Sequence, residues 1–460
     1  MYAKLETRYA LRGWKGIPYA LLDTQTLEIK VLDAEEFGLY EFLTGEVDLD
    51  FPLLSPRQKE CLETVLKDGV AAASGRPAPV SDFQRYKKSE SGYIQSVIWS
   101  VTGGCDLRCR HCYMGAGHHQ YPDLTTGECL DIIEQMEQAN VAGVDLSGGE
   151  PLLRPDFWQL VDALRAAGIL ILSLHTNGLL LDDDFFKNME ARSLDWCFVM
   201  SLDCLGAHDW LRGVDGAEEK TIAAIKRLGE MGRNVYVKTK LHSGNLDRLL
   251  PTYEWLKTQE GVKKWKISFV MALGDWKTAG HEELPPAVLF ELYEELVRRY
   301  RDDGQPLALS LHEGVFKAGK GSGITSMPHG REAEAAAGYA ALSCSACRAR
   351  PYLLPNGRLM PCWGMVGSEM ELQMPLLTQT RLAEVYGDPQ GNFRKLADIL
   401  TKDVIAHNPE CQACMYSSKC GGGCRADALL GGTGVMGKGV YACHILKNGY
   451  YARLHALAAH

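Results

Sequence analysis

Apolar and polar residues alternate with two different periods along this chain. Six short runs rich in β-branched and apolar residues occur between residues 93 and 272: SVIWSVT, AGVDLSG, ILILSLHTN, WCFVMSLD, NVYVKTKLH and KWKISFVMA. Amphipathic stretches with helical spacing separate them, for example TGECLDIIEQMEQAN, PDFWQLVDALRAAG, EEKTIAAIKRLGEMG and LDRLLPTYEWLKTQ. This pattern predicts an α/β fold in which parallel strands and right-handed helical crossovers form a partial (β/α)6 barrel over residues 93–315. Reactive groups of such barrels gather at the C-terminal ends of the strands.

The two ends of the chain follow other patterns. Within residues 1–74, RYALRGWKGIPYALLDTQTLEIKVLD predicts short antiparallel strands, and AEEFGLYEFLTG and SPRQKECLETVLKDG predict two helices. AAASGRPAPVSD indicates a linker, which we place at residues 75–92. Residues 316–460 are rich in Gly, Cys and Pro with little periodicity. We therefore expect metal sites to stabilise that region in place of a large apolar core.

Composition narrows the class of protein. The 460 residues are 46% hydrophobic, enough for two or three domains. A net charge of −9 without a basic stretch argues against nucleic acid or an anionic membrane as partner. The N-terminal segment MYAKLETRYALRGW has no signal-peptide core, and no window is apolar enough to span a bilayer. We expect a cytoplasmic protein.

The fifteen cysteines point to metal, because thiols in the cytoplasm stay reduced. Eleven of them fall in three groups, at 105–112, 344–362 and 411–443, and only Cys61, Cys129, Cys197 and Cys204 are scattered. The first group, GGCDLRCRHCYMG, follows the first strand and supplies three thiolates. A four-iron cluster held by three thiolates keeps one iron free for a small molecule. A zinc site completed by His111 or His118 is the alternative.

This CxxxCxxC motif, together with SGGEP, HTNG and SLDCLGAHDWLRG at later strand ends, resembles the radical S-adenosylmethionine (SAM) superfamily. The resemblance implies a catalytic [4Fe–4S] cluster on Cys105, Cys109 and Cys112. Its free iron would bind SAM, and reductive cleavage of SAM would give a 5′-deoxyadenosyl radical that abstracts hydrogen from substrate. It also implies cofactor-binding residues: Tyr113 beside the adenine, Ser147, Gly148, Gly149 and Glu150 at the amino group, Asn177 facing the cofactor, Ser201 at the ribose and Arg212 at the carboxylate.

The downstream cysteines resemble the SPASM extension of these enzymes, which holds two auxiliary [4Fe–4S] clusters. Their spacing is Cys347-x9-Gly357-x4-Cys362, then Cys411-x2-Cys414-x5-Cys420-x3-Cys424-x18-Cys443, with Cys344 as an eighth thiolate. By analogy we assign Cys344, Cys347, Cys362 and Cys424 to the first auxiliary cluster, and Cys411, Cys414, Cys420 and Cys443 to the second. The protein would then hold three clusters. Two structural zinc sites are the alternative.

SPASM enzymes mostly act on peptides or proteins, and residues 1–74 resemble a winged-helix-like element that grips the leader of a ribosomally made precursor peptide. A structural cap over the barrel is the alternative for this unit. The resemblance therefore implies a precursor peptide as substrate and a flavodoxin or ferredoxin type of electron donor as partner. The expected reaction is an intrapeptide crosslink, most of all a cysteine thioether as in the sactisynthases.

Other reactions remain open from the sequence. They are carbon–carbon cyclisation of side chains and epimerisation, in which Cys204 could donate hydrogen, although a buried inert thiol is the expected state of Cys204. Sulfatase-maturing enzymes typically have an aspartate after the first auxiliary PC motif, where this chain has Trp363 in MPCWGM, which argues against that reaction. A non-catalytic peptide-binding scaffold is disfavoured by the intact CxxxCxxC motif and Arg212.

Overall fold

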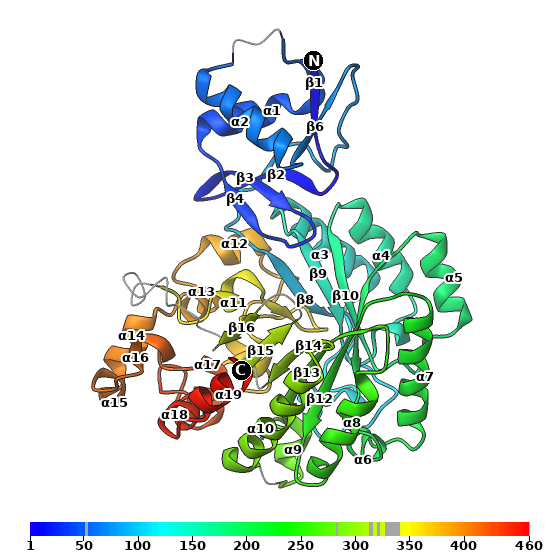
Figure 1. The fold of residues 1–460 in the computed structure, drawn as a ribbon, viewed down its shortest axis with the longest axis vertical. Helices are drawn as coiled ribbons and strands as arrows, with labels where there is room; N and C mark the ends of the chain where they lie inside the picture. The colour runs from blue at the N-terminus through cyan, green and yellow to red at the C-terminus, as the bar shows by residue number, and fades with distance from the viewer. Residues whose placement is uncertain (51–53, 282–283, 312–315, 320–322, 327–340, 460) are drawn as a thin grey trace.

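An eleven-stranded sheet organises the protein (Figure 1), with the order β16-β15-β14-β13-β12-β11-β10-β9-β8-β17-β18. The computed structural model describes residues 1–50, 54–281, 284–311, 316–319, 323–326 and 341–459. Strands β8 to β14 run parallel, in sequence order. They are β8 (Ser96–Ser100), β9 (Gly143–Ser147), β10 (Leu170–Thr176), β11 (Cys197–Ser201), β12 (Val235–Leu241), β13 (Val262–Phe269) and β14 (Ala308–Leu311). The predicted α/β class with a parallel sheet is confirmed.

The six predicted strands correspond to β8 to β13, and β14 adds a seventh parallel strand whose run ALSL is too short to identify from sequence. Helices follow the strands and lie outside the curved sheet (Figure 1). They are α3 (Thr126–Gln138), α4 (Phe157–Ala166), α5 (Asp183–Ala191), α7 (Ala217–Glu230), α8 (Leu249–Leu256) and α10 (Pro286–Asp302). A capping box of Thr125 and Glu128 begins α3, because each side chain binds a backbone N–H that the first helical turn leaves unpaired.

Both ends of the sheet extend past the barrel. On one side the hairpin of β15 (Phe316–Gly319) and β16 (Gly323–Ser326) pairs antiparallel with β14, so the sheet continues beyond residue 315, where we placed the end of the barrel. On the other side β17 (Tyr352–Leu353) pairs parallel with β8 and antiparallel with β18 (Leu359–Met360). Backbone hydrogen bonds therefore join the cysteine-rich region directly to the barrel.

The N-terminal unit contains two small sheets and its own core. The sheet β5-β1-β6 consists of β1 (Tyr2–Leu5), β5 (Thr44–Asp48) and β6 (Ala71–Ser74). The sheet β4-β3-β2-β7 consists of β2 (Tyr9–Trp14), β3 (Ile17–Asp23), β4 (Ile29–Val31) and β7 (Lys87–Lys88), and the predicted helices are α1 (Ala34–Phe42) and α2 (Pro56–Lys67). Because β7 pairs with β2, part of the predicted linker belongs to this unit.

This unit packs on the N-terminal ends of the barrel strands. Trp14 Nε1 donates to the Ala139 carbonyl (3.2 Å), and Asn140 Nδ2 donates to the Gly13 carbonyl (3.2 Å), just before β9 begins. Leu22 and Leu27 bury their side chains against Ala142, Leu170 and Leu172. The N-terminal unit and the C-terminal ends of the strands thus lie at opposite ends of the barrel (Figure 1).

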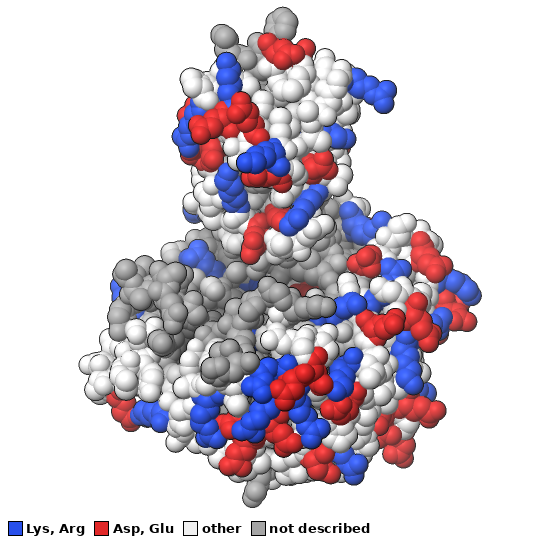
Figure 2. Space-filling model, viewed as in Figure 1, with Lys and Arg blue, Asp and Glu red and all other residues white. Residues whose placement is uncertain are grey.

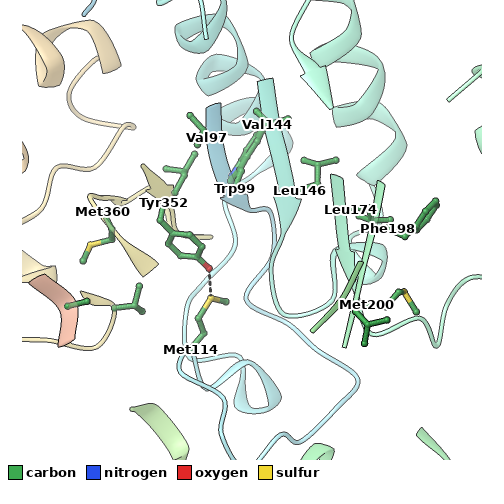
Figure 3. Close-up of a cluster of buried hydrophobic side chains, with 14 of the residues drawn as sticks. Val97, Trp99, Met114, Val144, Leu146, Leu174, Phe198, Met200, Tyr352 and Met360 are labelled. Atoms are coloured by element: carbon green, nitrogen blue, oxygen red, sulfur yellow. Dashed lines mark hydrogen bonds between the residues drawn. The ribbon is translucent and has the colours of Figure 1, made fainter. Parts of the chain in front are cut away.

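The C-terminal region is built from short helices but does not lack a core, contrary to our expectation. Tyr352, Met360 and other apolar side chains from it join the main core beside Val97 and Trp99 of β8 (Figure 3). This burial follows from the pairing of β17 with β8, which a two-residue strand does not reveal in sequence. The helices are α11 (Ser345–Ala349), α12 (Leu382–Gly387), α13 (Asn392–Ala397), α14 (Thr401–His407), α15 (Pro409–Gln412), α16 (Ser417–Cys420), α17 (Arg425–Leu430), α18 (Val440–Lys447) and α19 (Tyr450–Ala459). Among the described helices, none is long and apolar enough to cross a membrane.

Candidate functional site

The three-cysteine loop follows β8 at the C-terminal end of the barrel. Its thiols receive backbone hydrogen bonds: Leu107 N–H donates to Cys105 Sγ (3.4 Å) and Ala116 N–H donates to Cys112 Sγ (3.2 Å). Burial raises the pKa of Cys105, Cys109 and Cys112, so the thiolate forms need a compensating positive charge. Half-buried thiols with N–H···S contacts are a donor set that suits an iron–sulfur cluster.

Arg212 supplies positive charge to this loop. It ends the short helix α6 (His208–Arg212), and its NH1 donates to Cys109 Sγ (3.6 Å). Its Nε donates to Asp203 Oδ2 (2.5 Å), and Asp203 is completely buried. Burial alone would raise the pKa of Asp203, but Arg212 and His208 hold it well below its usual range. The aspartate therefore stays ionised and fixes the guanidinium beside the thiol. Asp203 lies within the SLDCLGAHDWLRG motif, but the sequence did not reveal that it holds Arg212 in place.

The SGGEP segment packs tightly under the cysteine loop. Gly149 is required there because a Cβ atom would lie 2.1 Å from the Gly104 carbonyl oxygen. Glu150 is fully buried, and its carboxylate accepts from the Thr176 hydroxyl (2.9 Å) and the Asn177 backbone N–H (2.8 Å). Its pKa is raised to about 7 by burial. Glu150 thus joins the ends of β9 and β10, and its contact with the amino group of SAM stays a prediction.

The remaining predicted cofactor residues lie at neighbouring strand ends. Asn177 Nδ2 donates to Asp106 Oδ1 (2.6 Å) inside the cysteine loop. Ser147 is the last residue of β9, and Ser201 is the last residue of β11. The structure therefore brings these side chains to one end of the barrel, and their individual roles stay predictions.

Tyr113 connects this loop to the C-terminal region. Its hydroxyl lies 2.7 Å from the Tyr352 hydroxyl, which also contacts Ser100 Oγ and donates to Met114 Sδ (3.1 Å, Figure 3). The Tyr113 ring lies 5.5 Å from the Trp363 ring, centroid to centroid. Sequence reasoning missed Tyr352, which has no local motif and stands 239 residues from Tyr113.

The structure brings the downstream cysteines together in the two sets assigned from the SPASM resemblance. In the first set, a hydrogen bond with Cys344, burial, and the nearby thiols of Cys362 and Cys424 raise the pKa of Cys347 well above its usual value. In the second set, Cys411, Cys414, Cys420 and Cys443 line one pocket. These two groupings interleave along the sequence, and ligation of clusters by them stays a prediction.

Within the described part of the chain, no three His, Cys, Asp or Glu side chains stand close enough together to hold a metal ion. The ligands of a four-iron cluster bind different irons and therefore stand farther apart than the ligands of one ion. For the zinc alternative, His118 is exposed, whereas the pKa of His111 is lowered to about 3 by burial and by Arg212.

The scattered cysteines differ in placement. Cys129 and Cys204 are buried, as expected of inert thiols, and Cys204 belongs to the main core. Its backbone has φ of 76°, a left-handed conformation that is costly for a residue with a side chain. Cys61 and Cys197 are only partly buried.

Comparison with known proteins identifies the barrel. Residues 99–256, which contain the cysteine loop and the strand-end motifs, match the model of the radical SAM superfamily. They form a radical SAM domain. SAM and one [4Fe–4S] cluster are the cofactors of that superfamily.

The relatives of the radical SAM domain include different activities. Streptococcus suis SuiB bound to the precursor peptide SuiA superimposes with a TM-score of 0.68 at 15% identity, covering 96% of this chain and 99% of that one, which shows a shared fold. An AdoMet-dependent heme synthase of Methanosarcina barkeri is 26% identical over 72% of this chain and 91% of its own length. The mycofactocin maturase MftC of Mycobacterium tuberculosis is 34% identical over 30% of this chain and 34% of its own length.

Proposed function

We propose that this protein is a radical SAM enzyme that modifies a ribosomally synthesised precursor peptide. The observation that carries the proposal is the N-terminal unit, which packs on the barrel end opposite the cysteine loop. Its strand β6 pairs on one side only among the described strands, whereas residues 78–80 hydrogen-bond along β5. An extended leader peptide can add to such an edge through backbone hydrogen bonds. The SuiB fold, determined with a precursor peptide, supports this proposal.

The cysteine loop would hold the SAM-binding cluster through Cys105, Cys109 and Cys112. When bound, this cluster and SAM supply the one-electron chemistry that activates an unreactive C–H bond. The chain's own part is to orient them: Asp203 fixes Arg212 at Cys109, and Glu150 fixes Asn177 at Asp106. A small acidic electron carrier of the flavodoxin or ferredoxin type would supply the electron, and the fifteen cysteines suit a cytoplasmic setting.

The two sets of four thiols in the C-terminal region would hold two auxiliary [4Fe–4S] clusters. Additional redox sites favour a net oxidation of the peptide, so we propose a crosslink, with a cysteine thioether as the expected bond. Carbon–carbon cyclisation satisfies the same oxidation balance. Epimerisation is less well supported, because Cys204 is fully buried in the main core and cannot reach a substrate there. Trp363 beside Tyr113, in place of an aspartate, disfavours sulfatase-type maturation.

Tetrapyrrole modification is the second candidate. It is favoured by the similarity to the heme synthase of Methanosarcina barkeri, because that match covers 91% of the heme synthase, whereas the match to MftC covers 34% of MftC. The N-terminal unit has no evident task in that reaction.

The experiment is anaerobic reconstitution with iron, sulfide, SAM and reductant, followed by mass spectrometry of candidate precursor peptides chosen from small open reading frames near the gene. Loss of two hydrogens with one cysteine protected from alkylation establishes a thioether, and the same loss with free thiols establishes a carbon–carbon link. An unchanged mass with one deuterium gained in heavy water indicates epimerisation. SAM cleavage that depends on a porphyrin and not on the peptide contradicts the peptide proposal.

A further inference from the structure

The inner face of the barrel carries a row of lysines. Side chains alternate between the two faces of a strand. On β12 and β13, Val235, Val237, Trp265 and Ile267 belong to the main core on the helix side. The intervening residues therefore point to the inner face: Tyr236, Lys238 and Lys240 from β12, and Lys264 and Lys266 from β13. Lys317 of β15 joins them, because its neighbours Phe316 and Ala318 are in the core.

The strand register places these cations side by side. Lys238 pairs with Lys266, Lys266 pairs with Ser310, and Ser310 pairs with Lys317, so three lysines lie in one lateral row. Like charges directly opposite one another on neighbouring strands destabilise a sheet. We call Lys238, Lys264, Lys266 and Lys317 the lysine face. In the protein without substrate, Lys238 and Lys266 also have partners within the chain itself. Lys238 Nζ, for example, lies 3.4 Å from His175 Nδ1.

Acidic residues are scarce on these strands. Within the bounds of β8 to β16 the sequence contains six lysines and one acidic residue, Asp145. Ser173 and Arg350 both donate to Asp145, at 2.5 Å and 2.8 Å. Burial and the neighbouring Lys317 and Lys266 lower the pKa of Lys264, which agrees with an excess of positive charge. Burial and nearby Lys238 lower the pKa of His175 in the same way.

This face is not packed like the interior of a closed barrel, which side chains fill. Tyr236 is 37% exposed, and the side chain of Arg350 is 44% exposed. The strands lead from the N-terminal unit at one end to the cysteine loop at the other (Figure 1). The outer surface differs from this face, because Lys and Arg are mixed there with Asp and Glu (Figure 2).

We propose that the lysine face binds carboxylate side chains of the substrate, so that the peptide segment crossing the barrel is rich in Asp or Glu. This rests on the proposed peptide substrate. Lys264 and Lys266 are two residues apart on one strand, hence about 7 Å apart, which is also the repeat of alternate side chains along an extended peptide. A peptide antiparallel or parallel to β13 can therefore place successive acidic side chains on successive lysines.

The test measures binding of fluorescein-labelled hexaglutamate and hexaglutamine to the full-length reconstituted protein by fluorescence anisotropy. The variants Lys264→Gln and Lys317→Gln each remove one charge from the face. The matched control is Lys263→Gln, on the same strand, because Lys263 is exposed and donates to the Glu260 carbonyl. Hexaglutamate should bind at least tenfold more tightly than hexaglutamine. Lys264→Gln should weaken it about fivefold to tenfold, because Lys264 is partly buried, and Lys317→Gln should weaken it about threefold to fivefold, because Lys317 is exposed. The control should stay within twofold.

Equal losses in Lys263→Gln and in the face variants, or no preference for hexaglutamate, would overturn the proposal. A porphyrin with two propionate groups is the second arm, because it also presents carboxylates. If the porphyrin binds in a way that depends on Lys264 and hexaglutamate does not bind, the carboxylates that the lysine face recognises do not come from a peptide, and the proposal is overturned. The stated hexaglutamate pattern in a protein that cleaves no SAM supports the lysine face while refuting the proposed enzymatic function. Melting curves by circular dichroism exclude unfolding of either variant.

Discussion

Replacement of Asp203 by Asn tests whether a buried ion pair supports the cysteine loop. Asp203 is completely buried and the Arg212 side chain is 11% exposed, with 2.5 Å between Oδ2 and Nε. At an effective dielectric constant of about 20 and a separation of charge centres of about 4 Å, the attraction is about 4 kcal/mol. Removing one member of such a pair also leaves the other charge buried, at a measured cost of about 3 to 5 kcal/mol. We expect Asp203→Asn to lower the free energy of unfolding by about 4 kcal/mol.

The assay is pulse proteolysis of iron-free protein in urea at low temperature. Asp184→Asn is the matched control, because Asp184 forms a pair with Lys187 in which both side chains are more than 70% exposed. That change should cost about 0.5 kcal/mol or less. The double variant Asp203→Asn/Arg212→Met should be more stable than the sum of the single changes by about 2 kcal/mol, because it leaves no unpaired charge. A cost for Asp203→Asn equal to that of Asp184→Asn would refute the reasoning.

The same pair has a pH signature. The pKa of Asp203 is lowered in the folded state, so its contribution is present above the unfolded pKa of about 4 and is lost as pH falls below that value. Wild type should therefore lose stability in acid, and Asp203→Asn should show a smaller loss.

Three further predictions follow from buried groups. Because burial raises the pKa of Glu150 to about 7, its contribution to stability is present below about pH 4.5 and is lost as pH rises to about 7. Unfolding of iron-free Glu150→Gln in urea should lack this loss, which amounts to about 3 kcal/mol. Cys420→Ala should lower the iron content after reconstitution by about one third, whereas buried Cys129→Ala should leave it unchanged, as measured by a colorimetric iron assay. Cys204→Gly should change the free energy of unfolding by less than about 1 kcal/mol, because relief of the positive φ offsets the lost side chain, and mass spectrometry should show unchanged peptide modification.

Much of the barrel could be predicted because its signals are local. Each of the six strands from β8 to β13 is at least five residues long and contains several β-branched or other apolar residues, and the motifs lie within a few residues of the strand ends. The contact between Tyr352 and Tyr113 could not be predicted, because it depends on the pairing of β8 with β17, a strand of only two residues. Tyr352 on β17 also contacts Ser100 on β8, and these two residues are 252 positions apart in the sequence. Burial of the C-terminal region follows from the same pairing and was missed for the same reason.

The role of Glu150 shows a different limit. The sequence SGGEP indicates close backbone approach, which Gly149 confirms against Gly104. It does not indicate which group the carboxylate binds. A buried carboxylate takes the nearest donors, and here the parallel register of β9 and β10 supplies them from Thr176 and Asn177. The donors come from another strand, so only the folded sheet reveals them.

The sequence VYVKTKL of β12 alternates apolar and polar residues. This alternation predicts a strand, and it also indicates what covers each face of the sheet. Parallel strands buried on both faces read as nearly continuous apolar runs. A parallel strand that instead alternates apolar and charged residues must have one face that apolar side chains do not cover. The helices take the Val235 and Val237 face, so the lysines are left on the inner face. An inner face of this kind is not a packed core, and because the charged residues that β12, β13 and β15 bring to it are lysines, the group that we propose for it is an anion.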